Sequence, residues 1–199
     1  GLAANYPSSN AGDEVYTSAI VIPALVPADV TGLLFSEYAE GTSNNKYLEI
    51  YNGTGAAIDL SGLAFPSVAN APETAGVYEY WNTFPAGASI AAGDVYIIAH
   101  GQADESILAV ADHTHNYLSN GNDGYCLVEG TEADYAVVDC IGNWDGDPGD
   151  GWNVAGVEEA TMNHTLVRKS TVTVGNEGDW AASAGDSPAN SEWIVLDVN

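Results

Sequence analysis

Residues 33–62 decide the fold class, and they read LLFSEYAEGTSNNKYLEIYNGTGAAIDLSG. In the segment KYLEIYN, Leu48 and Ile50 point to one face of an extended chain. The residues between and beside them point to the other face: Tyr47, Glu49 and Tyr51. This alternation has the period of a strand with one buried face. Because Gly, Asn and Ser separate the apolar runs, as they do in turns, the stretch predicts neighbouring β-strands.

Similar short runs recur through the rest of the chain between Gly, Asn, Asp and Pro residues. They are VYTSAIVI, VYEYW, DVYIIAHG, GYCLVEG, YAVVDCIG, HTLVRKSTVTV and EWIVLD. This spacing of short strands is typical of a β-sandwich. The best helical candidate is short, SILAVADH at residues 106–113. With 199 residues, of which 46% are hydrophobic, the chain can bury a core, and we predict an all-β fold.

The chain resembles the lamin tail domains of secreted bacterial proteins. Residues 33–62 are similar to the opening of such a domain. The motifs DVYIIAHGQA, LSNGNDGYCLVEG, VVDCIGNW, GDGWNVAG, HTLVRKSTVTVGN and DWAASAG follow in the family's order, so the resemblance covers residues 33–196. It implies an immunoglobulin-like antiparallel β-sandwich, which we expect to occupy residues 32–199.

The resemblance also implies structural roles for several polar residues. Four of them would tie the first hairpin and its loop through hydrogen bonds, with cation binding as the alternative: Glu37, Asn44, Asn45 and Glu49. Arg168 and Lys169 match a basic pair of the family. We expect this pair to form an internal ion pair rather than to bind a ligand.

Residues 1–31 precede the region of resemblance and predict an N-terminal arm. The arm contains the strand-like run VYTSAIVIPALV, residues 15–26. The residues expected to make its contacts are Val15, Tyr16, Ile20, Val21, Ile22 and Leu25. An apolar strand of this kind has to pair with a sheet edge, either in its own subunit or in a neighbour. We therefore predict an extension strand that can act as a donor strand between subunits.

The net charge is the most unusual feature of the composition. The chain has 28 acidic residues against Lys46, Arg168 and Lys169, which gives a formal net charge of −25. Direct binding of nucleic acid is disfavoured, because it requires clustered Lys and Arg side chains. Self-repulsion of this size also destabilises any assembly of like subunits unless cations screen or bridge the charge. We therefore expect a requirement for divalent cations, with Ca²⁺ as the candidate, or for high salt.

The sequence favours an extracellular or cell-surface location. The longest apolar run, residues 19–26, is interrupted by Pro23 and is much shorter than the ~20 residues that span a bilayer, so no membrane insertion is expected. A first residue Gly1 fits the removal of a secretory signal peptide. Two Asn-x-Thr sequons, at Asn52 and Asn163, are compatible with N-glycosylation.

An Asp-rich loop is the best candidate cation site. The loop NWDGDPGDGW, residues 143–152, can surround a hard cation with carboxylate and carbonyl oxygens, although it lacks the spacing of an EF-hand and an ordinary turn is the alternative. With a weaker candidate from the segment NGNDG, the predicted metal ligands are Asp145, Asp147, Asp150 and Asp123. His113 and His115 share one strand face, but a transition metal needs at least one further ligand there.

Cys126 and Cys140 lie in two strand-like runs around a polar turn. The midpoint between them is Ala133, inside that turn. In a hairpin of this register the two cysteines face each other, so a disulfide is geometrically possible. An oxidising compartment favours the disulfide over the alternative of two buried thiols.

The chain lacks the motifs of nucleophilic, metal-dependent and nucleotide-dependent enzymes. We therefore expect no enzyme but a structural subunit that assembles with itself into a filament, tube or surface coat. The alternative is a monomeric adhesion module for a surface glycan or protein, which could be accessory to a secreted hydrolase. Its candidate contact residues are the aromatic side chains of VYEYW, Tyr78, Tyr80 and Trp81, which core packing explains equally well.

Overall fold

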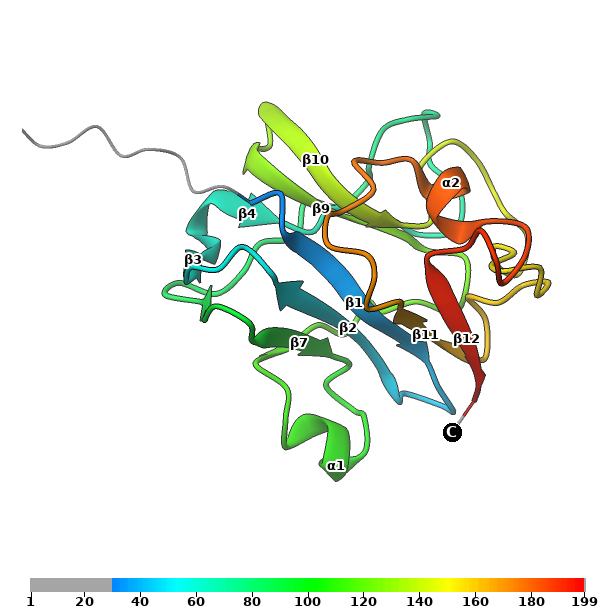
Figure 1. Ribbon diagram of the computed structural model, residues 1–199, viewed down its shortest axis with the longest axis horizontal. Helices are drawn as coiled ribbons and strands as arrows, with labels where there is room; N and C mark the ends of the chain where they lie inside the picture. Colours follow the sequence, from blue (N-terminus) through cyan, green and yellow to red (C-terminus); the bar gives the residue numbers. More distant parts are fainter. Residues whose placement is uncertain (1–29, 199) are drawn as a thin grey trace, which may run out of the picture.

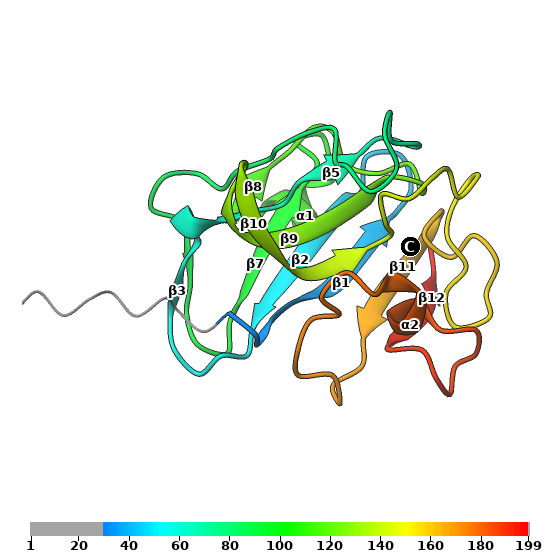
Figure 2. The same cartoon turned by 90° about the horizontal axis from the view of Figure 1, so that it is seen from above.

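The computed structural model describes residues 30–198, which form a β-sandwich of two main sheets (Figure 1). The predicted strand of the N-terminal arm, with all six of its contact residues, lies outside the described residues. In Figures 1 and 2, β9 (Gly124–Thr131) and β10 (Asp134–Ile141) of the smaller sheet lie over one face of the larger sheet, next to β1 (Leu33–Glu40).

The larger sheet has six strands in the order β12-β11-β1-β2-β7-β8. Their bounds are β1 Leu33–Glu40, β2 Lys46–Asn52, β7 Val95–Ala99, β8 His113–Thr114, β11 His164–Arg168 and β12 Trp193–Asp197. All neighbours are antiparallel except β7 and β8, which are parallel. The predicted all-β, immunoglobulin-like sandwich is confirmed, and β8 adds one parallel pairing at this edge.

The smaller sheet has the order β10-β9-β4, and β5 also pairs with β9. These strands are β4 Leu63–Ala64, β5 Ser67–Val68, β9 Gly124–Thr131 and β10 Asp134–Ile141, while β3 Ile58–Asp59 and β6 Ser89–Ile90 form a separate pair. The helical elements are a 3-10 turn at Leu60–Gly62, α1 at Glu105–Leu108 and α2 at Trp180–Ala184. The helix expected over residues 106–113 is shorter because His113 pairs with Ile98 as part of β8.

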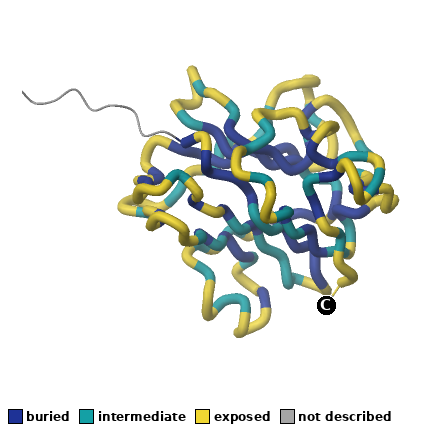
Figure 3. The backbone as a smooth tube through the Cα atoms, in the orientation of Figure 1, coloured by how far each residue is buried: buried dark blue, intermediate teal, exposed yellow. Residues whose placement is uncertain are grey.

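The core lies between the two sheets, where Figure 3 shows a continuous buried layer. In β2, Leu48 and Ile50 are buried, as the alternation of the sequence predicts. In β1, Leu33, Phe35 and Tyr38 are all buried, although strict alternation would separate Phe35 from Tyr38. The pairing register shifts between Phe35 and Glu37, so a bulge at this point changes the phase of the alternation. As a result, β1 contributes three large side chains to the core.

A buried carboxylate joins the two sheets. Asp139 of β10 has an exposed fraction of 0%. Its Oδ2 atom accepts a hydrogen bond from the Phe35 backbone N of β1 at 2.7 Å, and its two oxygens accept bonds from the Arg168 guanidinium of β11, each at 3.1 Å. The Asn176 backbone N donates to Asp139 Oδ1 at 2.8 Å. Because each oxygen accepts two bonds, the charge is compensated inside the core.

The chain's three Lys and Arg side chains all bond to protein groups. Arg168 pairs with Asp139 and also with Glu192, at 2.9 Å, and its guanidinium lies 4.5 Å from the ring centre of Trp193. Lys46 lies 2.8 Å from Glu40. Lys169 donates to the carbonyl oxygens of Pro188 and Ser191, so in the family's basic pair only Arg168 forms an internal ion pair. These contacts leave a strongly anionic surface.

Candidate binding site

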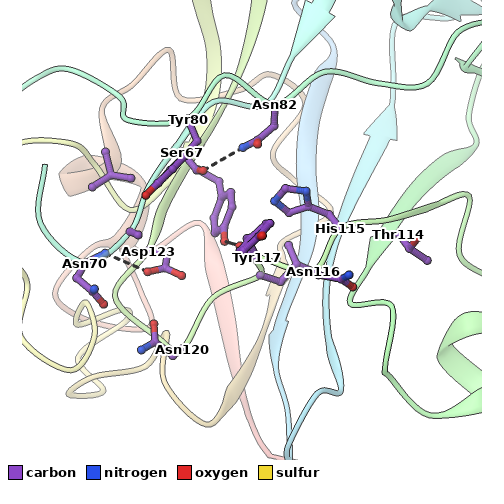
Figure 4. Close-up of a pocket in the computed structure, with 14 residues that line it drawn as sticks. Ser67, Asn70, Tyr80, Asn82, Thr114, His115, Asn116, Tyr117, Asn120 and Asp123 are labelled. Atoms are coloured by element: carbon purple, nitrogen blue, oxygen red, sulfur yellow. Dashed lines mark hydrogen bonds between the residues drawn. The ribbon is translucent and has the colours of Figure 1, made fainter.

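A cleft of about 890 Å³ opens between the two sheets, on the side where β5 and β8 lie, and Figure 4 shows the residues that line it. One wall comes from β5 and the residues that follow it, together with Tyr80 and Asn82. The opposite wall comes from residues 114–118, the segment after β8. Asp123 and Tyr125, around the start of β9, complete the lining. The volume lies in the usual range of small-molecule sites.

Two tyrosine rings at this cleft are largely exposed. Tyr117 has an exposed fraction of 82% and Tyr80 one of 55%. The Tyr117 ring packs edge-on against His115, with ring centroids 5.8 Å apart, and the Tyr117 backbone carbonyl accepts a hydrogen bond from Tyr125 Oη at 2.8 Å. The VYEYW motif is thus divided: Tyr78 and Trp81 pack with Tyr135 in an aromatic cluster, whereas Tyr80 lines the cleft. Tyr117 was not among the sequence candidates, because its role depends on the position of β8.

Polar side chains surround these rings (Figure 4). Asp123 Oδ1 accepts a hydrogen bond from the Asn70 backbone N at 3.0 Å, and burial raises the pKa of the Asp123 carboxyl. On the other side, His115 packs edge-on against Phe65, with ring centroids 5.4 Å apart. Burial, with the charges of His113 and His100, lowers the pKa of His115. Its imidazole is therefore neutral near pH 7 and offers one donor and one acceptor.

The outer strand β12 is an open sheet edge. Within residues 30–198, β12 pairs with β11 alone. Every second residue along this edge is an exposed apolar residue. They are Ile194, Leu196 and Val198, with exposed fractions of 47%, 47% and 43%. The edge of β10, by contrast, is covered: Glu177 N donates to Val138 O at 3.1 Å, and a Cβ atom on Gly175 would lie only 2.1 Å from that oxygen. The fold therefore protects one long edge and leaves β12 accessible.

The predicted metal ligands do not form one cluster. Among residues 30–198, no group of three or more His, Cys, Asp or Glu side chains is arranged to hold a metal ion. Asp145, Asp147 and Asp150 are exposed, and Asp147 Oδ1 caps its own turn by accepting from Gly149 N at 2.9 Å. Asp123 faces the cleft instead. The loop thus has the geometry of the turn that was the alternative, and Ca²⁺ binding stays a prediction.

The predicted disulfide forms, and the two Asn-x-Thr sequons differ in their exposure. Cys126 and Cys140 are direct partners across β9 and β10 and form a disulfide, with Cα atoms 4.1 Å apart. Asn163 is exposed. Asn52 is completely buried, and its Nδ2 atom donates to Ala56 O at 2.8 Å, so this sequon offers no accessible acceptor in the folded chain.

The family's polar residues tie the first hairpin to its surroundings. Asn45 exchanges two hydrogen bonds with Asp104, at 2.9 and 2.8 Å. Glu37 and Glu49 are direct neighbours across β1 and β2. Tyr47 donates to Glu37, and Ser36 Oγ donates to Glu49 Oε1 at 2.8 Å. These contacts are structural, and none of them gathers ligands for a cation among residues 30–198.

Replacing Glu49 by glutamine should stabilise the protein at neutral pH by up to about 1 kcal/mol, the range for like charges on facing strands. Burial raises the pKa of Glu49, and the Glu37 charge adds to the effect, while the Ser36 hydrogen bond opposes it. A folded pKa above the unfolded value means that this carboxyl costs stability as pH rises through that interval. The gain should therefore disappear below about pH 4, which urea unfolding at several pH values would measure.

The matched control is Glu158→Gln, at an exposed position on a loop. It should leave the free energy of unfolding almost unchanged. A gain for Glu49→Gln that persisted undiminished at low pH would contradict the electrostatic explanation.

The fold and cleft define the class of protein first: an immunoglobulin-like β-sandwich domain of the structural and binding kind. Residues 27–142, more than half of the chain, match the family model of the Lamin Tail Domain. The chain therefore belongs to the lamin tail domain family, and β11, α2 and β12 lie beyond the matched residues. No curated protein matches the chain, and no solved structure does. No helix among residues 30–198 is long and apolar enough to cross a membrane.

Proposed function

We propose that this chain is a non-catalytic, extracellular structural subunit that assembles with copies of itself. In this proposal, residues 14–26 of one subunit add as a strand to β12 of the next. The observation that carries it is the open edge of β12, with its row of exposed apolar side chains: Ile194, Leu196 and Val198. Edges of this kind template the addition of a further strand.

The composition of the arm suits that edge. Residues 14–26 contain one charged side chain, Glu14 at the start of the segment, so their strand brings little further repulsion to an anionic surface. Val167 of β11 lies beside Ile194 and is only partly buried, so the apolar strip continues from the edge onto the sheet. Because arm and edge are different surfaces, each added subunit presents a new edge, and the contact propagates instead of closing.

Charge and redox state support the remaining parts of the proposal. With its three Lys and Arg side chains bonded internally and a net charge of −25, this chain offers no cationic patch to a neighbouring copy. Mobile cations such as Ca²⁺ therefore have to screen the contact. The disulfide suits an oxidising extracellular setting.

Placing a lysine on the edge should abolish assembly. We expect the full chain to form long polymers with Ca²⁺ and to lose them in Leu196→Lys, because a charge on an exposed edge blocks strand addition. Electron microscopy and sedimentation velocity, each with Ca²⁺ and with chelator, would measure this. Val174→Lys is the matched control. Val174 is, like Leu196, an exposed apolar residue, with an exposed fraction of 54%, but it lies outside β12.

Deletion of residues 1–29 tests the donor strand and the acceptor edge separately. The truncated chain should not polymerise alone, but it should cap polymers of the full chain, because it keeps the acceptor edge and lacks the donor. Polymers that survive either the deletion or Leu196→Lys would overturn the proposal. A full chain that is monomeric with and without Ca²⁺ would also overturn it and would favour the alternative, a monomeric binding module.

A further inference from the structure

We propose that the cleft between β5 and β8 is a binding site for a short neutral oligosaccharide. This function is separate from assembly, because the cleft lies at the β8 side of the larger sheet and the open edge is β12, at its other end. The proposal rests on three properties of the lining: exposed aromatic rings, hydrogen-bonding groups of both kinds, and the absence of positive charge.

The aromatic rings match one requirement of sugar recognition. A sugar ring presents a face of C–H groups, which packs against the face of an aromatic side chain. Tyr117 and Tyr80 expose 82% and 55% of their surfaces, much more than their hydrophobic area favours in a folded chain without a partner. Two rings on separate segments can contact successive sugars or opposite faces of one.

The polar groups match the second requirement, since each sugar hydroxyl is both a donor and an acceptor. The Asp123 carboxylate offers about four acceptor positions, and the backbone N–H groups of Asn70 and Asn120 use two of them. The Asn120 side chain adds amide donors and an acceptor, Asn116 adds amide donors while its Oδ1 accepts from Gly101 N at 3.2 Å, and the His115 imidazole adds one donor and one acceptor. Figure 4 shows Asp123 and Asn120 on one side of the cleft and His115 and Asn116 on the other, with Tyr117 between them.

The cleft is also held in shape before any ligand binds. Ser67 and Tyr80 exchange backbone hydrogen bonds at 2.9 and 3.0 Å. Asn82 Nδ2 donates to Ser67 Oγ at 3.0 Å, and Tyr125 Oη donates to the Tyr117 carbonyl at 2.8 Å. A preformed site loses less conformational entropy on binding.

Charge decides which sugars fit. Asp123 is the one acidic residue of the lining, and no Lys or Arg lines the cleft. A sulfated or uronic-acid polysaccharide would therefore meet Asp123 without any compensating cation, on a protein of net charge −25. The ligand class is accordingly neutral, such as a glucan, mannan, galactan or chitin fragment.

The test uses the full chain and defined probes. Affinity gel electrophoresis would screen laminarin, mannan, galactan and soluble chitin oligosaccharides, with alginate as the anionic probe and trilysine as a cationic peptide. Calorimetry with the best neutral probe would then compare Tyr117→Ala with Tyr51→Ala, which truncates an exposed tyrosine on β2 outside the cleft. Tyr117→Ala should weaken binding by about tenfold or more, and Tyr51→Ala should not change it.

A second variant keeps the result interpretable. Asp123→Asn removes acceptor capacity while keeping the side-chain size, and it should also weaken binding. Equal thermal unfolding midpoints for Tyr117→Ala and the unaltered chain would show that lost binding is not lost folding. The proposal is overturned if no neutral probe binds, if only alginate or trilysine binds, or if Tyr117→Ala binds as tightly as Tyr51→Ala.

Discussion

Replacing Arg168 by methionine should lower the free energy of unfolding by about 3–5 kcal/mol, the cost of removing one partner of a buried ion pair. Asp139 has an exposed fraction of 0%, and Arg168 supplies two of the hydrogen bonds to its carboxylate. Without the guanidinium, Asp139 keeps only the backbone donors of Phe35 and Asn176. Urea unfolding followed by tryptophan fluorescence would measure the change.

Two controls isolate the buried charge. Lys169→Met removes the neighbouring cation, which bonds to carbonyl oxygens rather than to a carboxylate, and should cost much less. The double variant Arg168→Met with Asp139→Asn should recover part of the lost stability, because no uncompensated charge then remains.

The effect of Arg168→Met should also depend on pH. Burial raises the pKa of Asp139, while Arg168 and the backbone donors oppose the shift. Loss of Arg168 raises this pKa further, so the folded variant holds its proton to higher pH than the unfolded chain does. The destabilisation should therefore have its full value above the folded pKa of Asp139 in the variant, and it should shrink as pH falls from there towards the folded pKa of Asp139 in the unaltered chain. A destabilisation independent of pH would contradict this account.

Removing the disulfide should cost about 3 kcal/mol, the loop-closure value for a loop of about 15 residues. Cys126 and Cys140 are separated by 14 positions and join neighbouring strands of the smaller sheet. Both cysteines are almost fully buried, so alanine at both positions leaves no unpaired polar group. The expected result is a lower urea midpoint for the double variant Cys126→Ala, Cys140→Ala.

A reductant gives the matched comparison. Dithiothreitol should lower the midpoint of the unaltered chain towards that of the double variant and should not affect the double variant itself. Equal midpoints for the oxidised chain and the double variant would show that the bond adds no stability.

The local pattern of the sequence predicted much of the sandwich. The alternation around Leu48 and Ile50 predicted the buried face of β2, and the ordered motifs predicted the lamin tail family that the family match confirms. These features depend on residues that are close in sequence or on the periodic alternation of side chains along a strand. They can therefore be predicted from the sequence alone.

The register of the strands was less visible. The pairing register of β9 and β10 shifts by one residue between Val137 and Asp139, and this shift places Cys140 opposite Cys126. If the register of the outer part of the hairpin continued unchanged, Tyr125 would lie opposite Cys140 instead. The same shift accompanies the inward position of Asp139. Bulges arise from the packing of two sheets against each other, and a single strand sequence does not specify them.

The sequence alone was enough to predict an acidic, all-β domain of the lamin tail type. The alternation of side chains, the order of the motifs and the net charge are properties of the sequence itself. Only the tertiary structure decided that Tyr117, Tyr80 and Asp123 meet in one cleft, that Asn52 is buried and that, within residues 30–198, β12 keeps an open edge. These depend on which segments become neighbours when the two sheets pack, and sequence distance carries no information about that.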